Sequence, residues 1–482
     1  MFDVPMLINN KDARATGAKT YTRSNPMSGD AATSAAAASV VDANAAADAA
    51  AAAFPSWAAM GPSERRARLL KAADILGSRT GEATARMLGE TGSTAPWAAF
   101  NVMVGSSMLR EAASMITQVS GEVIPSDKPG CIAFSYRQPA GVVLGIAPWN
   151  APIILGVRAI AMPLACGNTV VLKASETCPA THRLIGEALR DAGLPEGVVN
   201  VVTNAPADAA AIVKALIAHP AVKRVNFTGS TKVGKLVAEE AARHLKPVLL
   251  ELGGKAPLIV LDDADLEAAV NAAVFGAYAN QGQICMSTEL AIVDESIADA
   301  FVQKLAARAA SLPTGDPRGH VVVGSMVSPE AADRVEEMIK QAVGAGAKLV
   351  AGGTRQGTVI TATVLDKVTP EMRLYSEESF GPVLCVVRVK GDDEAVRVAN
   401  ASEYGLSASV FGRDVLRAFE VAKRVQSGIC HVNGPTVHDE AQMPFGGTKG
   451  SGHGRFGGRA AINEFTELRW ITIEDPKQTY PF

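Results

Sequence analysis

Short apolar runs alternate with amphipathic stretches along the middle of the chain, beginning near residue 140. Each apolar run has the length of a buried strand, and each amphipathic stretch has the apolar spacing of a helix packed on a sheet. Strands and helices that alternate with short connections predict a parallel sheet with helices on its faces. The predicted strands are residues 169–172, 198–202, 222–227 and 247–250, and the predicted helices are residues 180–192, 207–218 and 232–244.

The uncharged stretch of residues 139–157 is close to the roughly 20 residues that a membrane-spanning helix needs. Pro148 and Pro152 interrupt it, and a helix would lose backbone hydrogen bonds at both prolines. We therefore expect a buried strand over residues 141–147, then a loop and a new helix, and no membrane segment.

A second alternating block, residues 258–432, predicts another α/β unit. Nearer the start, alanine-rich residues 43–53 predict a helix capped by Asp42, and a second helix is expected over residues 63–76. Residues 462–473 predict a late, isolated apolar strand, which is a candidate for pairing with another subunit. Within the second block we expect helices at 266–281, 297–312 and 393–399, strands at 290–293 and 408–411, and a loop at Gly352 and Gly353.

Length and composition favour a multidomain protein that binds a small molecule. At 482 residues, two or three domains are expected, and 46 Lys and Arg nearly balance 49 Asp and Glu, so neither nucleic acid nor a membrane surface is indicated. The six cysteines include no CxxC pair and no cysteine and histidine at zinc spacing, which predicts neither a disulfide framework nor a metal site. No signal-peptide pattern is present at the start, and a cytoplasmic location fits these features.

Three separated residues provide the groups that acyl chemistry at a carbonyl needs. Cys285 follows Gly282 in an otherwise apolar stretch, Glu251 lies among leucines, and Asn150 stands between two prolines. A thiol nucleophile, a carboxylate base and a fixed amide donor would serve attack, proton transfer and oxyanion binding. Each also has an ordinary interpretation: an inert core thiol, a salt-bridged structural acid, and a turn residue.

A glycine motif between a predicted strand and a predicted helix favours a phosphate group. Gly229, Gly234 and Lys235 match the spacing of a nucleotide-binding P-loop, but Leu236 replaces the hydroxyl residue that would bind magnesium. A nucleoside triphosphatase is therefore disfavoured and a dinucleotide favoured, while a tight turn without a ligand stays open. A second glycine run, residues 452–457, lies too near the end for a strand–helix–strand unit, and we interpret it as a turn near the active-site mouth.

Taken in order, eight motifs resemble those of the aldehyde dehydrogenase superfamily over essentially the whole chain. Within that superfamily, the chain is similar to bacterial dehydrogenases of aromatic aldehydes. The residues that carry this similarity are 61–66, 282–288 and 480–482. The eight motifs are residues 147–150, 167–173, 193–195, 227–230, 250–255, 282–285, 377–382 and 444–449.

The resemblance implies an α/β architecture of three parts. A cofactor domain with a five-stranded Rossmann-like parallel sheet would comprise residues 1–117 and 138–250, and an α/β catalytic domain residues 251–461. Residues 118–137 and 462–482 would form a small β element for oligomerisation, in a homo-oligomer for which a dimer is favoured over a tetramer.

The resemblance also implies NAD(P)-dependent oxidation of an aldehyde to a carboxylic acid. Cys285 would form a thiohemiacetal whose oxyanion Asn150 and the Cys285 backbone N–H hold, and Glu251 would activate water to hydrolyse the thioester. Relatives that transfer the acyl group to coenzyme A lack this carboxylate. An aliphatic or semialdehyde dehydrogenase is the alternative, and a non-catalytic structural protein on the same scaffold is another.

The remaining implied roles concern the cofactor and the substrate. Glu176 favours NAD, since its carboxylate would repel a 2′-phosphate, although some NADP use is expected. Arg158 stands where many relatives have an aromatic residue. Its guanidinium could stack on a ring or hydrogen-bond a phenolic oxygen, which predicts hydroxybenzaldehyde-type substrates, or it could be a plain surface or ion-pair residue. The implied cofactor residues are Ile146, Pro148, Trp149, Lys173, Ser175, Glu176, Phe227, Gly229, Ser230, Gly234, Leu252, Glu378 and Phe380, and the implied substrate residues are Trp97, Arg158, Ile284, Met286 and Phe445.

Overall fold

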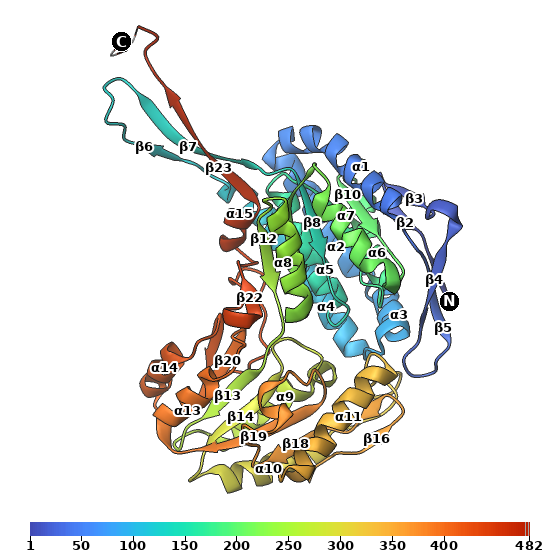
Figure 1. Cartoon of the computed structure of the whole chain (residues 1–482), viewed down its shortest axis with the longest axis vertical. Helices are drawn as coiled ribbons and strands as arrows, with labels where there is room; N and C mark the ends of the chain where they lie inside the picture. The colour runs from blue at the N-terminus through green and yellow to red at the C-terminus, as the bar shows by residue number, and fades with distance from the viewer. Residues whose placement is uncertain (478, 481) are drawn as a thin grey trace.

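Two mainly parallel sheets, each covered by helices, organise the chain into two lobes (Figure 1). The computed structural model describes residues 1–477, 479, 480 and 482. Position 481 of the motif at residues 480–482 therefore lies outside the described residues. The alternation of strands and helices predicted from the sequence is confirmed, and with it the α/β fold class.

The first sheet has eight strands in the order β22-β12-β11-β8-β9-β10-β2-β3. Its five central strands are parallel, which is the Rossmann-like arrangement that the resemblance implied. From β8 the chain adds β9 and β10 on one side and then β11 and β12 on the other, so the order reverses between β8 and β11. The strands are β2 Met6–Ile8, β3 Lys11–Ala13, β8 Val142–Ile146, β9 Thr169–Lys173, β10 Val199–Val202, β11 Val222–Thr228, β12 Val248–Glu251 and β22 Gly452–His453.

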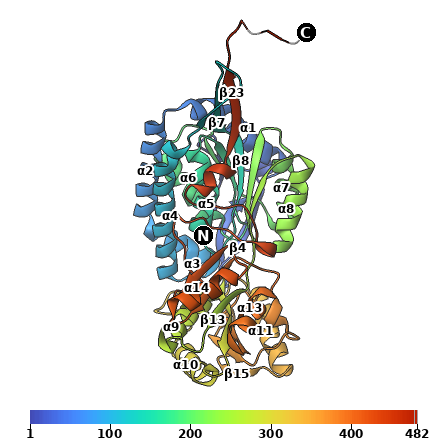
Figure 2. The ribbon, with the colours of Figure 1, turned by 90° about the vertical axis from the view of Figure 1, so that its left-hand side faces the viewer.

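Helices cover both faces of this sheet, as the edge-on view shows (Figure 2). One buried cluster joins the sheet to the helices on one face, and a second cluster joins it to those on the other face. The first group is α2 Pro62–Ser78, α4 Ala95–Met115, α5 Pro152–Ala165 and α6 Pro179–Asp191, beside α3 Thr80–Thr91, and the second is α1 Val40–Ala59, α7 Ala209–Ala218 and α8 Thr231–Arg243.

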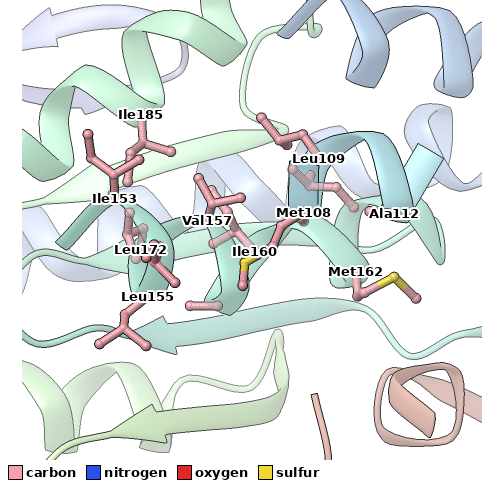
Figure 3. Close-up of a cluster of buried hydrophobic side chains, with 14 of the residues drawn as sticks. Met108, Leu109, Ala112, Ile153, Leu155, Val157, Ile160, Met162, Leu172 and Ile185 are labelled. Carbon is pink, nitrogen blue, oxygen red and sulfur yellow. The ribbon is translucent and has the colours of Figure 1, made fainter. Parts of the chain in front are cut away.

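Helix α5 is buried along its whole length, and its position matters because Asn150 lies just before it. Side chains of α4 and α6 pack around it (Figure 3). Gly145 in β8 allows this close approach, since a Cβ there would lie 2.9 Å from the Cβ of Ala159. The small residue therefore sets the distance between the helix and the strand.

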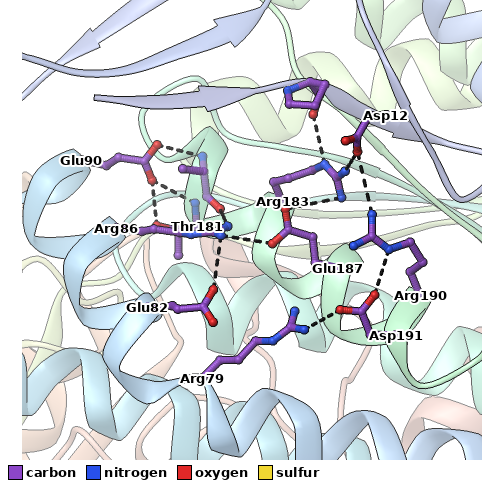
Figure 4. Close-up of polar contacts among 12 residues, drawn as sticks. Asp12, Arg79, Glu82, Arg86, Glu90, Thr181, Arg183, Glu187, Arg190 and Asp191 are labelled. Carbon is purple, nitrogen blue, oxygen red and sulfur yellow. Dashed lines mark hydrogen bonds and ion pairs between the residues drawn. The ribbon is translucent and has the colours of Figure 1, made fainter.

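A buried carboxylate anchors the start of α6. Glu90 of α3 is fully buried and accepts hydrogen bonds from the backbone N–H groups of Ala180 (2.8 Å) and Thr181 (3.0 Å). Arg86 and Arg183 extend these contacts to neighbouring acids (Figure 4). A carboxylate at a helix N-terminus satisfies free N–H groups and interacts favourably with the helix dipole.

The second sheet has the order β15-β18-β19-β14-β13-β20-β21, and all neighbours except β15 and β18 are parallel. Buried clusters lie on both of its faces. The strands are β13 Ala256–Val260, β14 Thr288–Asp294, β15 Lys348–Ala351, β18 Thr363–Asp366, β19 Val383–Val389, β20 Ser407–Phe411 and β21 Ile429–Val432, and the helices are α9 Leu266–Tyr278, α10 Ala298–Ala310, α11 Pro329–Gly344, α12 Arg373–Ser376, α13 Gly391–Asn400 and α14 Val415–Arg424.

An antiparallel arm in the order β23-β7-β6 projects from the first lobe (Figure 1). Trp470 on β23 is 76% exposed and Val123 on β6 is 81% exposed, which is unusual for large apolar side chains. The arm comprises β6 Glu122–Ile124, β7 Ile132–Pro139 and β23 Thr466–Ile473; β1 Phe2–Val4, β4 Thr20–Ser24 and β5 Ala31–Ala36 form another small sheet, and β16 Arg355–Gln356 pairs with β17 Val359–Ile360.

Four local predictions are wrong. Ser39 caps α1, because its side chain accepts from the N–H of Asp42 while Asp42 bonds back to Ser39. Helix α9 ends at Tyr278, because the backbone takes positive φ at residues 280 and 281. The last strand begins only at residue 466, after the short helix α15 Ala460–Glu464, and it pairs with β7 of the same chain. The expected turn at residues 452–457 begins with β22, which extends the first sheet.

The uncharged stretch of residues 139–157 forms β8, a loop and the beginning of α5, as predicted. Within the described part of the chain, no helix has the length and apolar character needed to cross a membrane.

Replacing Gly145 with valine should destabilise the protein by about 1–3 kcal/mol, because the new side chain would push α5 away from β8. Urea-dependent unfolding measures the change. Gly81→Ala is the control, since a Cβ at that exposed helical position meets no atom within 4 Å. Equal stability of the two variants would contradict the close-contact interpretation.

Candidate active site

A crevice lies where the strand order of the first sheet reverses. The carboxyl ends of β8 and β11 diverge there, and ligands of open parallel sheets bind at such positions. A cavity of about 440 Å³ occupies this place, bordered by Asn150 after β8, Gly229 after β11 and Glu251 at the end of β12. The second lobe contributes Cys285 and Glu378 to the same cavity.

Cys285 lies at the junction of this cavity and a larger one, because it borders both. The turn before it depends on Gly282, where φ is +70° and a Cβ would lie 2.1 Å from the carbonyl oxygen of Gly381. Asn280 and Gln281 also take positive φ. This unusual turn ends α9 early and places the thiol between the lobes.

Glu251 is fully buried, and neither of its carboxylate oxygens has a hydrogen-bond partner among the described residues. Burial raises the pKa of Glu251 to about 6, and the positive charge of Arg158 opposes the shift. Burial, and then the neighbouring Glu251 carboxylate, raise the pKa of the Cys285 thiol well above its ordinary value. At neutral pH a protonated thiol therefore stands beside a mostly ionised carboxylate.

Hydrogen bonds on both sides hold Asn150 in place. The backbone carbonyl oxygen of Asn150 accepts hydrogen bonds from Trp97 Nε1 (3.0 Å) and Asn280 Nδ2 (2.9 Å). Its side-chain Nδ2 donates to the carbonyl oxygen of Gln283 at 3.0 Å, which uses one of the two N–H groups of the amide. None of the described residues accepts a hydrogen bond from the backbone N–H of Cys285. The second amide N–H of Asn150 and this backbone N–H are thus two donors beside the thiol.

The larger cavity, of about 920 Å³, has mainly apolar walls. All five residues implied for the aldehyde pocket border it: Trp97, Arg158, Ile284, Met286 and Phe445. The resemblance did not point to several others, including Phe100, Leu155, Val437, His438 and Asp439.

Arg158 and Asp439 form a buried ion pair in the wall of the larger cavity. Their side chains are 5% and 8% exposed. The guanidinium carbon of Arg158 also lies 4.0 Å from the centre of the Phe445 ring, within the range of a cation–π contact. Arg158 therefore does form an ion pair, as one interpretation of the sequence expected. The pair is buried and borders the cavity, so Arg158 is not a surface residue.

Seven of the thirteen residues implied for the cofactor border the smaller cavity, and Arg334 and Tyr404, which were not predicted, border it too. The seven are Pro148, Trp149, Gly229, Ser230, Leu252, Glu378 and Phe380, whereas Ile146, Lys173, Ser175, Glu176, Phe227 and Gly234 do not border it.

The residues away from the smaller cavity have other contacts. Lys173 pairs with Glu176, which also accepts from Asn204 Nδ2 at 3.0 Å. Gly234 in α8 allows Leu252 to approach, because a Cβ there would lie 2.4 Å from a Leu252 methyl carbon.

An internal ion pair positions the loop that carries Glu378 and Phe380. Glu289 pairs with Lys255 in the interior and accepts from the backbone N–H groups of Ser379 and Phe380 at 2.8–3.0 Å. Phe380 takes an unusual φ of +48°, and its ring meets Trp149 edge-on at 5.8 Å. Burial raises the pKa of Glu378 to about 8.

A Rossmann-like sheet with a crevice at its switch point is typical of dinucleotide-dependent enzymes, and here a thiol, a carboxylate and an amide border that crevice. The family model described as "Aldehyde dehydrogenase family" matches residues 13–471, and the chain belongs to this family.

Named relatives cover the full length of the chain. It is 61% identical over 482 residues, all of both chains, to a vanillin dehydrogenase of Pseudomonas fluorescens. It is 52% identical over 479 residues, 99% of each chain, to a salicylaldehyde dehydrogenase of Pseudomonas putida. The crystal structure of a salicylaldehyde dehydrogenase from Pseudomonas putida G7 complexed with salicylaldehyde matches with a TM-score of 0.98 and 51% identity, covering 100% of both chains.

Arg158→Leu should destabilise the protein by about 3–5 kcal/mol, because it leaves the Asp439 charge buried and unpaired. The double variant Arg158→Leu/Asp439→Leu should recover much of that loss. Arg110→Leu is the control, since Arg110 and Asp74 form an exposed pair worth about 0–1 kcal/mol. Urea-dependent unfolding of all variants provides the comparison, and equal losses in the two single arginine variants would show that the buried pair is not stabilising.

Proposed function

We propose that the protein oxidises an aromatic aldehyde of the hydroxybenzaldehyde type to its carboxylic acid, with a nicotinamide dinucleotide as hydride acceptor. The observation that carries the proposal is the position of Cys285 at the meeting point of two cavities, next to Glu251 and Asn150. One cavity can admit the aldehyde and the other the nicotinamide, so the sulfur has access to both.

The first step is attack of the Cys285 sulfur on the carbonyl carbon. Glu251 takes the thiol proton, since its carboxylate is mostly ionised at neutral pH and lies beside the thiol. The carbonyl oxygen becomes an oxyanion that the Asn150 side-chain amide and the Cys285 N–H hold, and the product is a thiohemiacetal. Losing one such donor typically costs about 10²–10³ in rate.

The smaller cavity fits a dinucleotide by its chemistry. Gly229 and Ser230 place the N-terminus of the thirteen-residue helix α8 at its edge, where N–H groups attract a pyrophosphate. Glu378 offers a carboxyl group to ribose hydroxyls. Trp149 and Phe380 give it aromatic walls. A nicotinamide dinucleotide held by these residues would supply the hydride acceptor, and loss of hydride from the thiohemiacetal carbon would leave a thioester on Cys285.

NAD is the preferred cofactor in this proposal. Glu176 lies shortly after the end of β9, and its carboxylate would repel a 2′-phosphate. Its pairing with Lys173 reduces that repulsion, so slower turnover with NADP is expected.

After Glu251 has released the thiol proton to solvent, it completes the cycle by removing a proton from water, which attacks the thioester, releases the acid and frees the Cys285 sulfur. Its place beside the sulfur and its raised pKa suit a general base near neutral pH, a role worth about 10²–10⁴ in rate.

The walls of the larger cavity favour an aromatic substrate over an aliphatic aldehyde or a semialdehyde. Trp97, Phe100 and Phe445 give it flat apolar surfaces, and the relatives named above are dehydrogenases of vanillin and salicylaldehyde. The guanidinium of Arg158 is the donor available to a ring hydroxyl in that wall.

The exposed apolar arm supports a homo-oligomer, for which we favour a dimer. An edge strand such as β23 with Leu468 and Trp470 exposed is a surface that a second copy would cover. A cytoplasmic location is consistent with the six free cysteines.

Purified protein should reduce NAD with benzaldehyde, vanillin and salicylaldehyde, more slowly with NADP, and poorly with propanal and succinic semialdehyde. NADH absorbance measures the rates. Cys285→Ala should abolish turnover, and Cys131→Ala, at a partly exposed thiol outside both cavities, should not. Comparable efficiency with propanal would contradict the aromatic preference, and activity in Cys285→Ala would contradict the mechanism.

The kcat/KM for benzaldehyde should fall as the pH drops through about 6, because protonated Glu251 cannot accept a proton. Benzaldehyde is suitable because it has no ionisable group. Glu251→Gln should lower kcat by about 10²–10⁴ and remove this acid limb. An acid limb that persists in the variant would assign the titration to another group.

A further inference from the structure

The buried carboxylate of Asp439 has a function in the proposed aldehyde site that the motifs do not indicate. It borders the same cavity as Cys285 and Arg158, and it follows β21 in a loop of the second lobe. One of its oxygens, Oδ2, pairs with Arg158. The other, Oδ1, is buried and has no hydrogen-bond partner among the described residues.

An unpaired buried acceptor is costly, typically by about 1–3 kcal/mol. Glu251 has the same property, which is explained by its need to bind a thiol proton or a water. Asp439 affects that chemistry only through its charge, which adds to burial in raising the pKa of Glu251, so its free oxygen needs a separate explanation. The side chain is 8% exposed, and the neighbouring Phe445 ring covers the paired guanidinium.

We infer that Asp439 recognises a substrate hydroxyl as a hydrogen-bond donor, while Arg158 donates to the oxygen of the same hydroxyl. This inference rests on the proposed function and identifies the substrate class as ring-hydroxylated aldehydes bound as neutral phenols. A hydroxyl both donates and accepts, so it satisfies the two members of the ion pair together. A methoxy group accepts only, and a phenolate has no proton to donate.

Asp439 therefore reverses the preference between phenol and phenolate that Arg158 alone would give. A lone guanidinium would favour a phenolate over a phenol, since opposite charges attract. With the carboxylate beside it, the pair is neutral overall, and its unpaired oxygen repels an anion. A site built to bond a hydroxyl rejects analogues that leave its buried polar group unpaired.

The first test compares each hydroxybenzaldehyde with its methyl ether, using the 2-, 3- and 4-isomers, and benzaldehyde as reference. In the wild-type protein, the hydroxy compound should have the higher kcat/KM at one or more ring positions. Asp439→Asn should lower that ratio by about 10- to 100-fold, the worth of a hydrogen bond to a charged group, and keep most of the benzaldehyde activity. Glu440→Gln is the matched control, because its carboxylate is next in sequence but exposed.

Two results of this comparison overturn the inference. In one, Asp439→Asn leaves the ratio of hydroxy to methoxy compound unchanged. In the other, benzaldehyde activity falls as much as that of the hydroxy compound, which would make Asp439 a support of the fold.

A second test needs no variant. Hydroxyacetophenone and methoxyacetophenone are ketones with no hydride to transfer, and their binding to the wild-type protein is measured by calorimetry as the pH rises. Affinity for the hydroxy ketone, relative to the methoxy ketone, should fall through the pKa of its own phenol. A rise instead would show that Arg158 acts without Asp439 and would overturn the inference.

The methoxy ketone corrects for titration of the protein. The groups facing Asp439 from the elements around it affect both ligands in the same way. They are Arg158 of α5, Glu111 of α4, Glu251 of β12, Arg308 of α10, Cys285, and His438 and Glu440 of its own loop.

Failure of the proposed function would look different. In that case the wild-type protein would oxidise no aldehyde with either dinucleotide. Binding of the two ketones needs no turnover, so it would still test whether Asp439 recognises the hydroxyl group.

Discussion

The burial of the Glu251 carboxylate beside the Cys285 thiol is the constraint on which the rest of the site depends. Neither oxygen of Glu251 has a partner among the described residues, and burial raises its pKa to about 6. Full hydration of the carboxylate would lower that pKa again, so the packing around Glu251 sets its protonation state. Burial and the neighbouring carboxylate also raise the pKa of the thiol.

Two lobes are needed to build this junction. The first sheet provides Glu251 at the end of β12 and Asn150 after β8, and the second lobe provides Cys285 after α9 and Glu378 after α12. Close contacts between backbones hold the junction together: a Cβ at Gly254 would lie 2.1 Å from the carbonyl oxygen of Cys285. The strand order reversal opens the crevice in which these groups meet.

Local patterns were sufficient for most of the central sheet, because its strands are continuous apolar runs and their ends agree with the structure within about two residues. The end of α9 was missed, since Asn280 and Gln281 take positive φ where their side chains donate to the distant carbonyl oxygens of Asn150 and Ser325. Family motifs pointed to Cys285, Glu251 and Asn150. They did not point to Asp439, because its partner Arg158 lies 281 positions away and only the folded chain brings the two together.

The most direct test of the central claim is mass spectrometry of the Glu251→Gln protein after mixing with NAD and benzaldehyde. Burial and the charge of Glu251 raise the pKa of the Cys285 thiol, so without that charge the sulfur should still lose its proton to solvent and form the thioester, while hydrolysis is slowed. We predict one benzoyl group on the Cys285 peptide and an equal amount of NADH. An acyl group on another cysteine, or NADH formed without any adduct, would contradict the assignment of Glu251 and Cys285 as base and nucleophile.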